Sequence, residues 1–511
     1  MTTGEVVSPH TAASAAGRRV LADGGGALDA AVATALALTV VYPHNCSLGG
    51  DLFAVVEQAD GRRHAINASG RAALATDVDE VRRRFGRRMP ITGPATVTVP
   101  GLVSGLAALH ARGGVLPWSR LFTDAVGLAE DGFPLAGSLA AALRDDGDSL
   151  LADPGLRGVF GRDGRPLSPG AHVVQPALAA TLRAIAADGP DVLYRGAVGE
   201  RLVAGLSRLG SPLRGPDLAE HRVDVGAPLH VRFGATDVHT CSPNSQGFVL
   251  LQILSVVAAL GLTDPLGADV AGLARVLRRT AQERARHLAD PDLMTVTAEE
   301  LLAPDYVAAL AADVAGGGEL APAPRAQGAG DTVAVVAADS AGNRVSLIQS
   351  LFHSFGARIL EPDTGVVLQN RGCAFSLDPD EVAVLAPGRR PPHTLTPLLA
   401  ATPERSLVIG TMGGKAQPQI LTQVLLRLLD GASPAVAVGA PRWVVGGMEV
   451  GQPEDTVHLE SDVPAATRDR LAGVGWPVVV HAPHSEELGH AHAIRVLGGE
   501  FAGAADPRSD G

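Results

Sequence analysis

A run of alanine, leucine and valine between residues 27 and 42 constrains the fold of this chain most strongly. The stretch LDAAVATALALTVVYPH is apolar on nearly every face of a helix and is stopped by Pro43, so it predicts a helix that is buried on all sides. The segment that follows, SLGGDLFAVVEQADGRRHAINASGR, predicts a glycine turn that leads into a strand hairpin.

Helical patterns dominate the chain from Pro100 to about Pro304. The stretches GLVSGLAALHARGG and WSRLFTDAVGLAEDG each end at glycine, as helices commonly do. In VAGLARVLRRTAQERARHLADP, apolar residues recur at helical spacing with arginines on the opposite face. The basic run at 82–88 has no interleaved aromatic residues, so it predicts the solvated face of a short helix rather than a nucleic-acid site.

The pattern changes from helix to strand after residues 316–330. That segment, GGGELAPAPRAQGAG, has no apolar periodicity and predicts an exposed flexible linker. Beyond it, TVAVVAAD and NRVSLIQSL predict one strand hairpin, and ARILEP and GVVLQN predict another. SLVIGTM predicts a further strand, and QPQILTQVLLRLLD a helix. Strands preceded and followed by helices favour a layered α/β protein.

Charge and composition exclude several classes of function. The net charge of −12 over 511 residues argues against a nucleic-acid or anionic-membrane binder. Three scattered cysteines make no disulfide framework. No window approaches the ~20 uninterrupted apolar residues of a membrane span, and MTTGEVVSPH has no signal-peptide pattern. We expect a soluble, cytoplasmic protein that has neither a nucleic-acid nor a membrane partner. Lys415, the single lysine, is worth locating.

Thr332 is the first candidate for chemistry, because it begins a buried strand directly after the linker. If the bond between Asp331 and Thr332 were cut, the threonine would carry a free α-amine with a pKa near ~8 beside its hydroxyl. One residue would then supply both base and nucleophile. The position is also compatible with an ordinary strand start, since threonine is a good strand former.

Two further patterns are compatible with a functional site. Gly413 and Gly414 stand between a strand and a helix, where free backbone N–H groups can cradle an oxyanion, although an ordinary tight turn fits as well. Near the end of the chain, HAPHSEELGHAH holds four histidines and two glutamates, but it has no HExxH and no paired cysteines. A polar loop is the favoured interpretation. We therefore expect no metal and no organic cofactor. The histidines and glutamates of this stretch are His481, His484, His490, His492, Glu486 and Glu487.

The sequence resembles the gamma-glutamyltransferase family of N-terminal-nucleophile hydrolases over nearly its whole length. The resemblance is carried by GGGALDAAVATALALTVVYPHNCSLGGDLFAVV, PGLVSGLAAL, LPWSRLFTDAVGLAEDGFP and RARHLADPDL, then by GDTVAVVAADSAGNRVSLIQSLFHSFGARILEPDTGVVLQN, RRPPHTLTP and GTMGGKAQPQ. It implies a four-layer αββα sandwich made as an inactive precursor. The precursor would cut itself into residues 1–331, which end in the linker 316–331, and residues 332–511. The two fragments would form one interleaved domain, a heterodimer, with a dimer of heterodimers left open.

The resemblance also assigns roles to particular residues. Thr332 matches the nucleophile of self-cleavage and turnover, and Asp331 precedes the cut. Ser350 falls where the family has a second threonine whose hydroxyl supports the nucleophile; serine retains a hydroxyl there. Gly413 and Gly414 match the oxyanion-hole glycines.

His393 and Thr394 lie where the family usually has a serine pair in contact with substrate. Thr394 retains a hydroxyl there, whereas His393 does not match. Lys415 directly follows the oxyanion glycines. It faces solvent, or it joins Arg371 in attracting an anionic substrate.

The departures from the family pattern concern the substrate. Where the family has an arginine for the substrate α-carboxylate, this chain has Ala68, with Arg71 three residues on. Where the family has an acidic residue for the α-amino group, the stretch NRGCAFS places Arg371 and Ala374, and Phe352 replaces an asparagine. An extra arginine without a carboxylate should exclude an ammonium group. The motifs GDTV, SLIQSLFHSFG, LQNRG and GTMGG resemble the branch that includes oxamate amidohydrolase.

We therefore predict a self-cleaving amidohydrolase that forms an acyl-enzyme from a small, carboxylate-bearing amide and passes the acyl group to water. Two alternatives remain open within the family resemblance. One is a true gamma-glutamyl hydrolase or transferase that acts on glutathione. The other is an unprocessed, inactive homologue that binds small carboxylates. A metal-dependent hydrolase built on the C-terminal histidines is the least favoured hypothesis.

Overall fold

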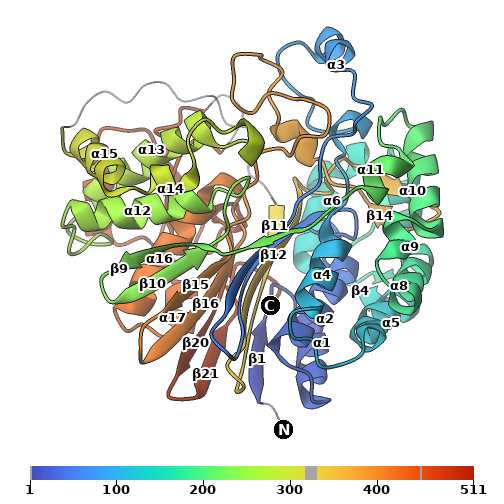
Figure 1. Cartoon of the computed structure of the whole chain (residues 1–511), viewed down its shortest axis with the longest axis horizontal. Coiled ribbons are helices and arrows are strands. Elements are labelled where there is room, and N and C mark those ends of the chain that lie inside the picture. Colours follow the sequence, from blue (N-terminus) through green and yellow to red (C-terminus); the bar gives the residue numbers. More distant parts are fainter. Residues whose placement is uncertain (1–2, 317–330, 449–451) are drawn as a thin grey trace.

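Two six-stranded antiparallel sheets lie face to face at the centre of the computed structural model, which describes residues 3–316, 331–448 and 452–511 (Figure 1). The first sheet has the order β1 (Gly4–Val7), β11 (Asp331–Asp339), β12 (Arg344–Phe352), β2 (Asp51–Glu57), β3 (Arg63–Ala68) and β8 (Asp224–Gly226). The second has the order β21 (Glu500–Ala504), β20 (Ala491–Leu497), β16 (Arg405–Thr411), β15 (Leu398–Ala401), β10 (Thr236–Thr240) and β9 (Leu229–Phe233). An apolar core joins them, with Phe53 and Ile348 from the first sheet and Val408 and Ile494 from the second.

Helices cover the outer face of the first sheet. They are α1 (Thr11–Ala22), α2 (Ala27–Val41), α4 (Leu102–His110), α5 (Thr123–Asp131) and α8 (Pro176–Asp188), and their apolar residues form one core with β11 and β12. All residues of α2 are buried, which confirms the helix predicted from its uniformly apolar pattern.

A second set of helices covers the outer face of the second sheet (Figure 1). It includes α12 (Gly247–Ala259), α13 (Val270–His287), α15 (Pro304–Gly316) and α16 (Gln417–Leu429). The order of layers is helices, sheet, sheet, helices, which confirms the αββα sandwich.

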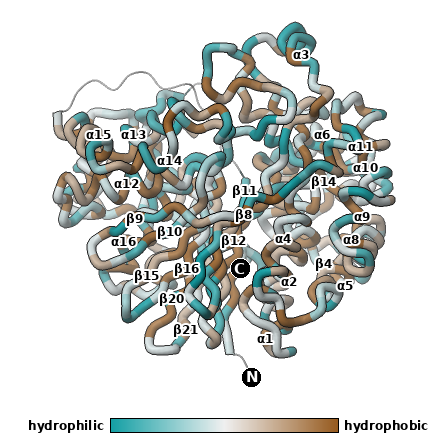
Figure 2. The backbone as a smooth tube through the Cα atoms, in the orientation of Figure 1, coloured by the Kyte–Doolittle hydropathy of each residue, from teal (hydrophilic) through white to brown (hydrophobic). Residues whose placement is uncertain are grey.

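The expectation of a mostly helical middle segment is wrong between residues 224 and 240. Three short strands, β8, β9 and β10, run there and extend one edge of each sheet. In β9, the apolar residues of LHVRF alternate with the exposed His230 and Arg232. This is the pattern of a strand with one buried face, and the helical interpretation of the segment overlooked it. By contrast, α3 (Val78–Phe85) has no buried residue, as its basic pattern predicts, and is largely hydrophilic in Figure 2.

Strands that precede the predicted cut and strands that follow it belong to the same sheet. β11 and β12, which follow position 331, lie between β1 and β2, which precede it. The predicted linker falls almost wholly on residues 317–330, which lie outside the described residues. In the described ranges, no helix is long and apolar enough to cross a membrane.

Candidate active site

Thr332 lies at the start of the central strand β11, and its side chain is completely buried. The pairing of β11 with β12 shifts register between Asp331 and Val333, so the threonine occupies a bulge. Its hydroxyl donates a hydrogen bond of 3.0 Å to Oγ of Ser350 on β12.

Ser350 connects the Thr332 hydroxyl to the peptide bond that precedes it. Its own hydroxyl donates to the carbonyl oxygen of Asp331 at 2.7 Å, and it accepts from the N–H of Phe352 at 2.8 Å. A donor on that carbonyl stabilises negative charge that develops on the oxygen when the carbon is attacked. The Thr332 hydroxyl and the Asp331 carbonyl therefore share one hydrogen-bonding partner.

Arg371 brings a cation to these hydroxyls. It is fully buried in a short 3₁₀ turn, Arg371–Ala374. Its guanidinium makes only long contacts with Oγ of Ser350 (3.5 Å) and Oγ1 of Thr394 (3.4 Å), and its Nε has no hydrogen-bonding partner. Within the described part of the chain, no carboxylate forms an ion pair with it. Burial lowers the pKa of Arg371 to about 9, against the opposing effect of Asp51.

Phe352 covers the guanidinium of this arginine. Its ring lies under the guanidinium, with 3.8 Å from the Arg371 Cζ to the ring centroid. The φ angle of Phe352 is 87°, a region that few residues other than glycine adopt. Such strain persists only where the surroundings fix it, and it is often found at functional sites.

His393 is held by Asp51 beneath the same cluster. His393 Nε2 lies 3.2 Å from Oδ2 of Asp51, and both side chains are fully buried. Burial raises the pKa of Asp51 to about 6 and holds the pKa of His393 well below its usual range. Gln369 and the N–H of Gly70 donate to the other oxygen of Asp51, each at 3.0 Å. Asp51 was not among the predicted site residues. The signal that could have indicated it is that it is the only charged residue in the apolar stretch SLGGDLFAVV.

Gly413 and Gly414 form a turn that other residues could not adopt without strain. Their φ angles are 136° and 53°, and a Cβ on Gly413 would lie 2.5 Å from Cδ1 of Ile420. Gln246 holds the turn, because its Nε2 donates to the carbonyl oxygens of Gly414 (3.0 Å) and Thr394 (2.9 Å). The turn leads through Gly414–Ala416 into the N-terminus of α16, where backbone N–H groups favour negative charge.

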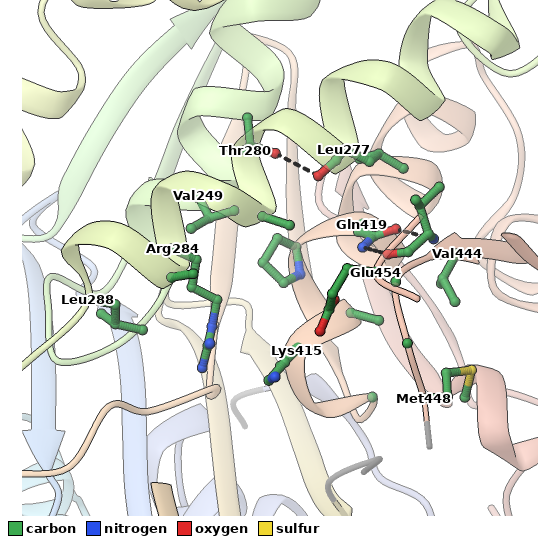
Figure 3. A pocket seen from close by; sticks show the side chains of 18 of the residues that line it. Val249, Leu277, Thr280, Arg284, Leu288, Lys415, Gln419, Val444, Met448 and Glu454 are labelled. Atoms are coloured by element: carbon green, nitrogen blue, oxygen red, sulfur yellow. Dashed lines mark hydrogen bonds between the residues drawn. The ribbon is translucent and has the colours of Figure 1, made fainter. Parts of the chain in front are cut away.

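A cavity of about 180 Å³ opens beside this turn (Figure 3). Gly413, Phe352 and Lys415 line it, whereas Thr332 is fully buried and does not line it. Lys415 is half-buried and lines the cavity, a position that fits the anion-attracting alternative better than a fully exposed surface lysine. Burial, followed by repulsion from Arg284, lowers the pKa of Lys415 to about 8.

Arg284 is a site residue that the sequence analysis did not select. It lies on α13, lines the cavity, and donates from Nε to Oε1 of Gln246 at 2.7 Å. The only sequence signal was its place in RARHLADPDL, a stretch that carries the family resemblance.

The structure does not bring Arg71 to this cluster. Its guanidinium binds Asp290 (3.3 Å) and the carbonyl of Gly388 (3.0 Å). That pairing satisfies the charge, so the prediction of a substrate contact by Arg71 is not supported by its position.

The C-terminal histidines do not form one polar loop. His490 and His492 are fully buried at the start of β20, while His481 contacts His458 (3.0 Å) and Glu487 (2.8 Å) and His484 is exposed. Among the described residues, no group of three or more His, Cys, Asp or Glu side chains could hold a metal ion.

Comparison with known proteins places these features in context. Residues 13–511 match the family model described as gamma-glutamyltranspeptidase. The oxamate amidohydrolase proenzyme of Klebsiella pneumoniae is 39% identical, over all of this chain and 98% of the relative. The glutathione hydrolase-like YwrD proenzyme of Bacillus subtilis is 34% identical, over 99% of this chain and 97% of the relative. The crystal structure of cephalosporin acylase from Bacillus halodurans superposes with a TM-score of 0.90 at 30% identity, covering 100% and 95% of the two chains.

Proposed function

Since this chain belongs to the gamma-glutamyltranspeptidase family and is a self-processing amidohydrolase or acyltransferase, we propose that its substrate is a small amide with a carboxylate and without an α-ammonium group. The acyl group passes through Thr332 to water. The observation that carries this proposal is the buried guanidinium of Arg371 beside the Thr332–Ser350 pair.

Self-cleavage comes first. The Thr332 hydroxyl attacks the Asp331 carbonyl carbon, whose oxygen already accepts a hydrogen bond from Ser350. The peptide nitrogen leaves as the acyl group moves to the Thr332 oxygen, which gives an ester and a free α-amine. Water then hydrolyses the ester, so that residue 331 ends in a carboxylate and Thr332 becomes an N-terminus.

Turnover repeats this chemistry on a substrate. The new α-amine takes the proton of the Thr332 hydroxyl, and the oxygen attacks the substrate amide. The N–H groups at Gly413 and Gly414 stabilise the tetrahedral oxyanion, and the loss of one such donor typically costs ~3 kcal/mol. Water, or an acceptor amine, then removes the acyl group from Thr332.

Arg371 selects the acyl group. A buried cation without an ion-pair partner is costly, and a substrate carboxylate would relieve that cost. The same cation would repel the α-ammonium group of a gamma-glutamyl substrate. Oxamate, which the K. pneumoniae relative is named for, belongs to the favoured class.

A second candidate is gamma-glutamyl hydrolysis, because relatives named glutathione hydrolase proenzyme match at 30% and 28% identity. A substrate panel on processed protein separates the two. We expect oxamate to be hydrolysed faster than a gamma-glutamyl anilide; the opposite order would refute the role given to Arg371. Cut protein that hydrolyses neither but binds small carboxylates would instead favour an inactive homologue.

A further inference from the structure

The cavity beside Gly413 is larger than a small acyl group requires. Its volume is about 180 Å³, and an apolar protein cavity of about 150 Å³ already accommodates benzene. Its walls are largely apolar side chains from α12, α13 and the segment around 444–448 (Figure 3). They include Val249, Ile253, Leu277, Leu288, Val444 and Met448.

Two cations point into this apolar space. Figure 3 shows the ends of the Arg284 and Lys415 side chains in the same part of the cavity, near the carboxylate of Glu454. Across residues 3–316, 331–448 and 452–511, none of these three groups forms an ion pair. Oε1 of Glu454 is buried and has no hydrogen-bonding partner. Two half-buried cations therefore line the cavity together with one half-buried carboxylate.

The remaining acidic groups are at its rim. Glu381 and Glu487 both line the opening and are exposed, and Glu487 already pairs with His481 at 2.8 Å. The part of the cavity lined by Arg284, Lys415 and Glu454 thus has two cations against one carboxylate, and this excess of positive charge favours an anionic ligand.

Phe352 divides the region around the nucleophile into two compartments. The Arg371 guanidinium stacks on the Phe352 ring, is fully buried and does not line the cavity. We assign the Arg371 side to the short acyl group, whose carboxylate would contact this guanidinium. The cavity, which Phe352 and Gly413 border, remains for the other half of the amide.

We propose that the cavity binds the amine half of the substrate, and that this half is an amino acid with an apolar side chain whose carboxylate contacts Lys415 and Arg284. This inference rests on the proposed function. The substrate class is an N-acyl amino acid such as N-oxalyl-leucine. Water cleaves its amide bond to give oxalate and leucine; the acyl carbon gains the water oxygen and the amine gains a proton.

The test compares three amides on the processed enzyme: oxamate, N-oxalyl-L-leucine and N-oxalyl-L-leucinamide. The last two differ only in the charge of the leaving group. We expect kcat/KM for N-oxalyl-L-leucine to exceed that of the leucinamide by about tenfold or more, because the carboxylate makes charge-assisted hydrogen bonds. Equal values would overturn the inference, whereas hydrolysis of oxamate would still support the proposed function.

Three variants test which residues bind the carboxylate. Lys415→Met should reduce the ratio of kcat/KM for leucine over leucinamide severalfold, and Lys415→Arg should restore part of it. Glu454→Gln removes the opposing charge and should raise the ratio. A ratio that Lys415→Met leaves unchanged would refute the assignment of the carboxylate to this cavity.

A binding measurement covers the case in which none of the amides is hydrolysed. That result would contradict the proposed function. Calorimetry with N-acetyl-L-leucine and N-acetyl-L-leucinamide on the processed protein then measures the affinity of the cavity for each ligand directly. Tighter binding of the carboxylate, lost in Lys415→Met, would support the cavity assignment, and equal binding of the two would overturn it.

Discussion

The hydroxyl of Ser350 accepts a hydrogen bond from Thr332, the proposed nucleophile, and donates one to the carbonyl of Asp331, which Thr332 is proposed to attack. Ser350→Ala leaves the Asp331 carbonyl without this donor, so we expect self-cleavage to slow by roughly a hundredfold, the cost of losing one oxyanion donor. Denaturing gels of freshly purified protein over time measure the rate. Thr332→Ala should remain one chain indefinitely.

The matched control for Ser350→Ala is Ser346→Ala. Both serines are buried on β12, but Ser346 donates to the carbonyl of Ile409 between the sheets. Ser346→Ala should affect thermal stability and leave the cleavage rate close to that of the unmodified chain. Equal slowing by both variants would show that packing of β12, and not the hydrogen bond to Asp331, controls the cut.

Arg371→Gln tests the proposed binding of the substrate carboxylate by Arg371. Glutamine keeps polarity and some length but removes the charge. Because a hydrogen bond to a charged group is worth about 1.5–3 kcal/mol and two can form, we expect kcat/KM for oxamate to fall by roughly a hundredfold or more, mainly through KM. A melting temperature within a few degrees of the unmodified protein must accompany this loss. An unchanged KM would contradict the role of Arg371.

The sequence predicts some of these residues better than others. Thr332, Ser350 and Gly413 fall in motifs whose order along the chain resembles that of a known family. Asp51 and Arg284 were missed, because their partners, His393 and Gln246, are far away in the sequence and no local pattern indicates the contact. Arg71 was selected by its distance from Ala68, but the fold directs it to Asp290.

A buried ion-pair network fixes the segment that follows β21. Asp506 accepts from Arg442 at 2.8 Å and from Arg508 at 2.9 Å, and Arg508 also binds Glu460. All four side chains are almost completely buried. The network connects the chain terminus to β18 (Val457–Glu460) and to the segment before β17 (Trp443–Val445).

Asp506→Asn should therefore be strongly destabilising. Removal of one partner from a buried network leaves uncompensated charge, which costs about 3–5 kcal/mol of unfolding free energy. Urea denaturation measures it. Asp60→Asn, which breaks the exposed pair with Arg62 in the turn between β2 and β3, is the control and should cost at most about 1 kcal/mol. Similar losses in both variants would show that the buried network contributes little.

The elements with long apolar runs were predictable, and the short edge strands β8 and β9 were not predicted. Helix α2 and the hairpin of β11 and β12 have enough apolar residues in sequence to specify burial on their own. Strand β8 pairs with β3, which lies far away in the sequence, so its position depends on the assembled sheet. Strand β9 pairs with β10 across a short turn, and its alternating LHVRF pattern was a local signal that was not used.

For the whole molecule, self-cleavage should not separate the fragments. β11 and β12 belong to the second fragment but lie between strands of the first, so neither fragment can complete a sheet alone. We expect one native species on gel filtration that yields residues 1–331 and 332–511 only in denaturant. Two native peaks would contradict this.

The buried ionisable groups predict how stability depends on pH. Among the described residues, burial lowers the pKa of nine histidines, six of them to about 3 or 4, so the fold favours their neutral form while the unfolded chain protonates them near pH 6.5. They are His10, His44, His64, His221, His239, His393, His458, His490 and His492. As the pH falls below about 6.5, the unfolded chain binds these protons and the fold does not, which lowers stability.

Four carboxyl groups of the described residues act in the opposite direction. Burial raises the pKa of Glu5, and it raises the pKa of Asp51 to about 6, of Asp331 to about 7 and of Glu486 to about 8. The fold therefore binds their protons before the unfolded chain does, and stability rises as the pH falls. The nine histidines outweigh these four carboxyl groups. We therefore expect a lower urea midpoint at pH 5 than at pH 7.5, with an unchanged slope. A higher midpoint at pH 5 would mean that the buried carboxyl groups dominate, and that these histidines take up protons without unfolding.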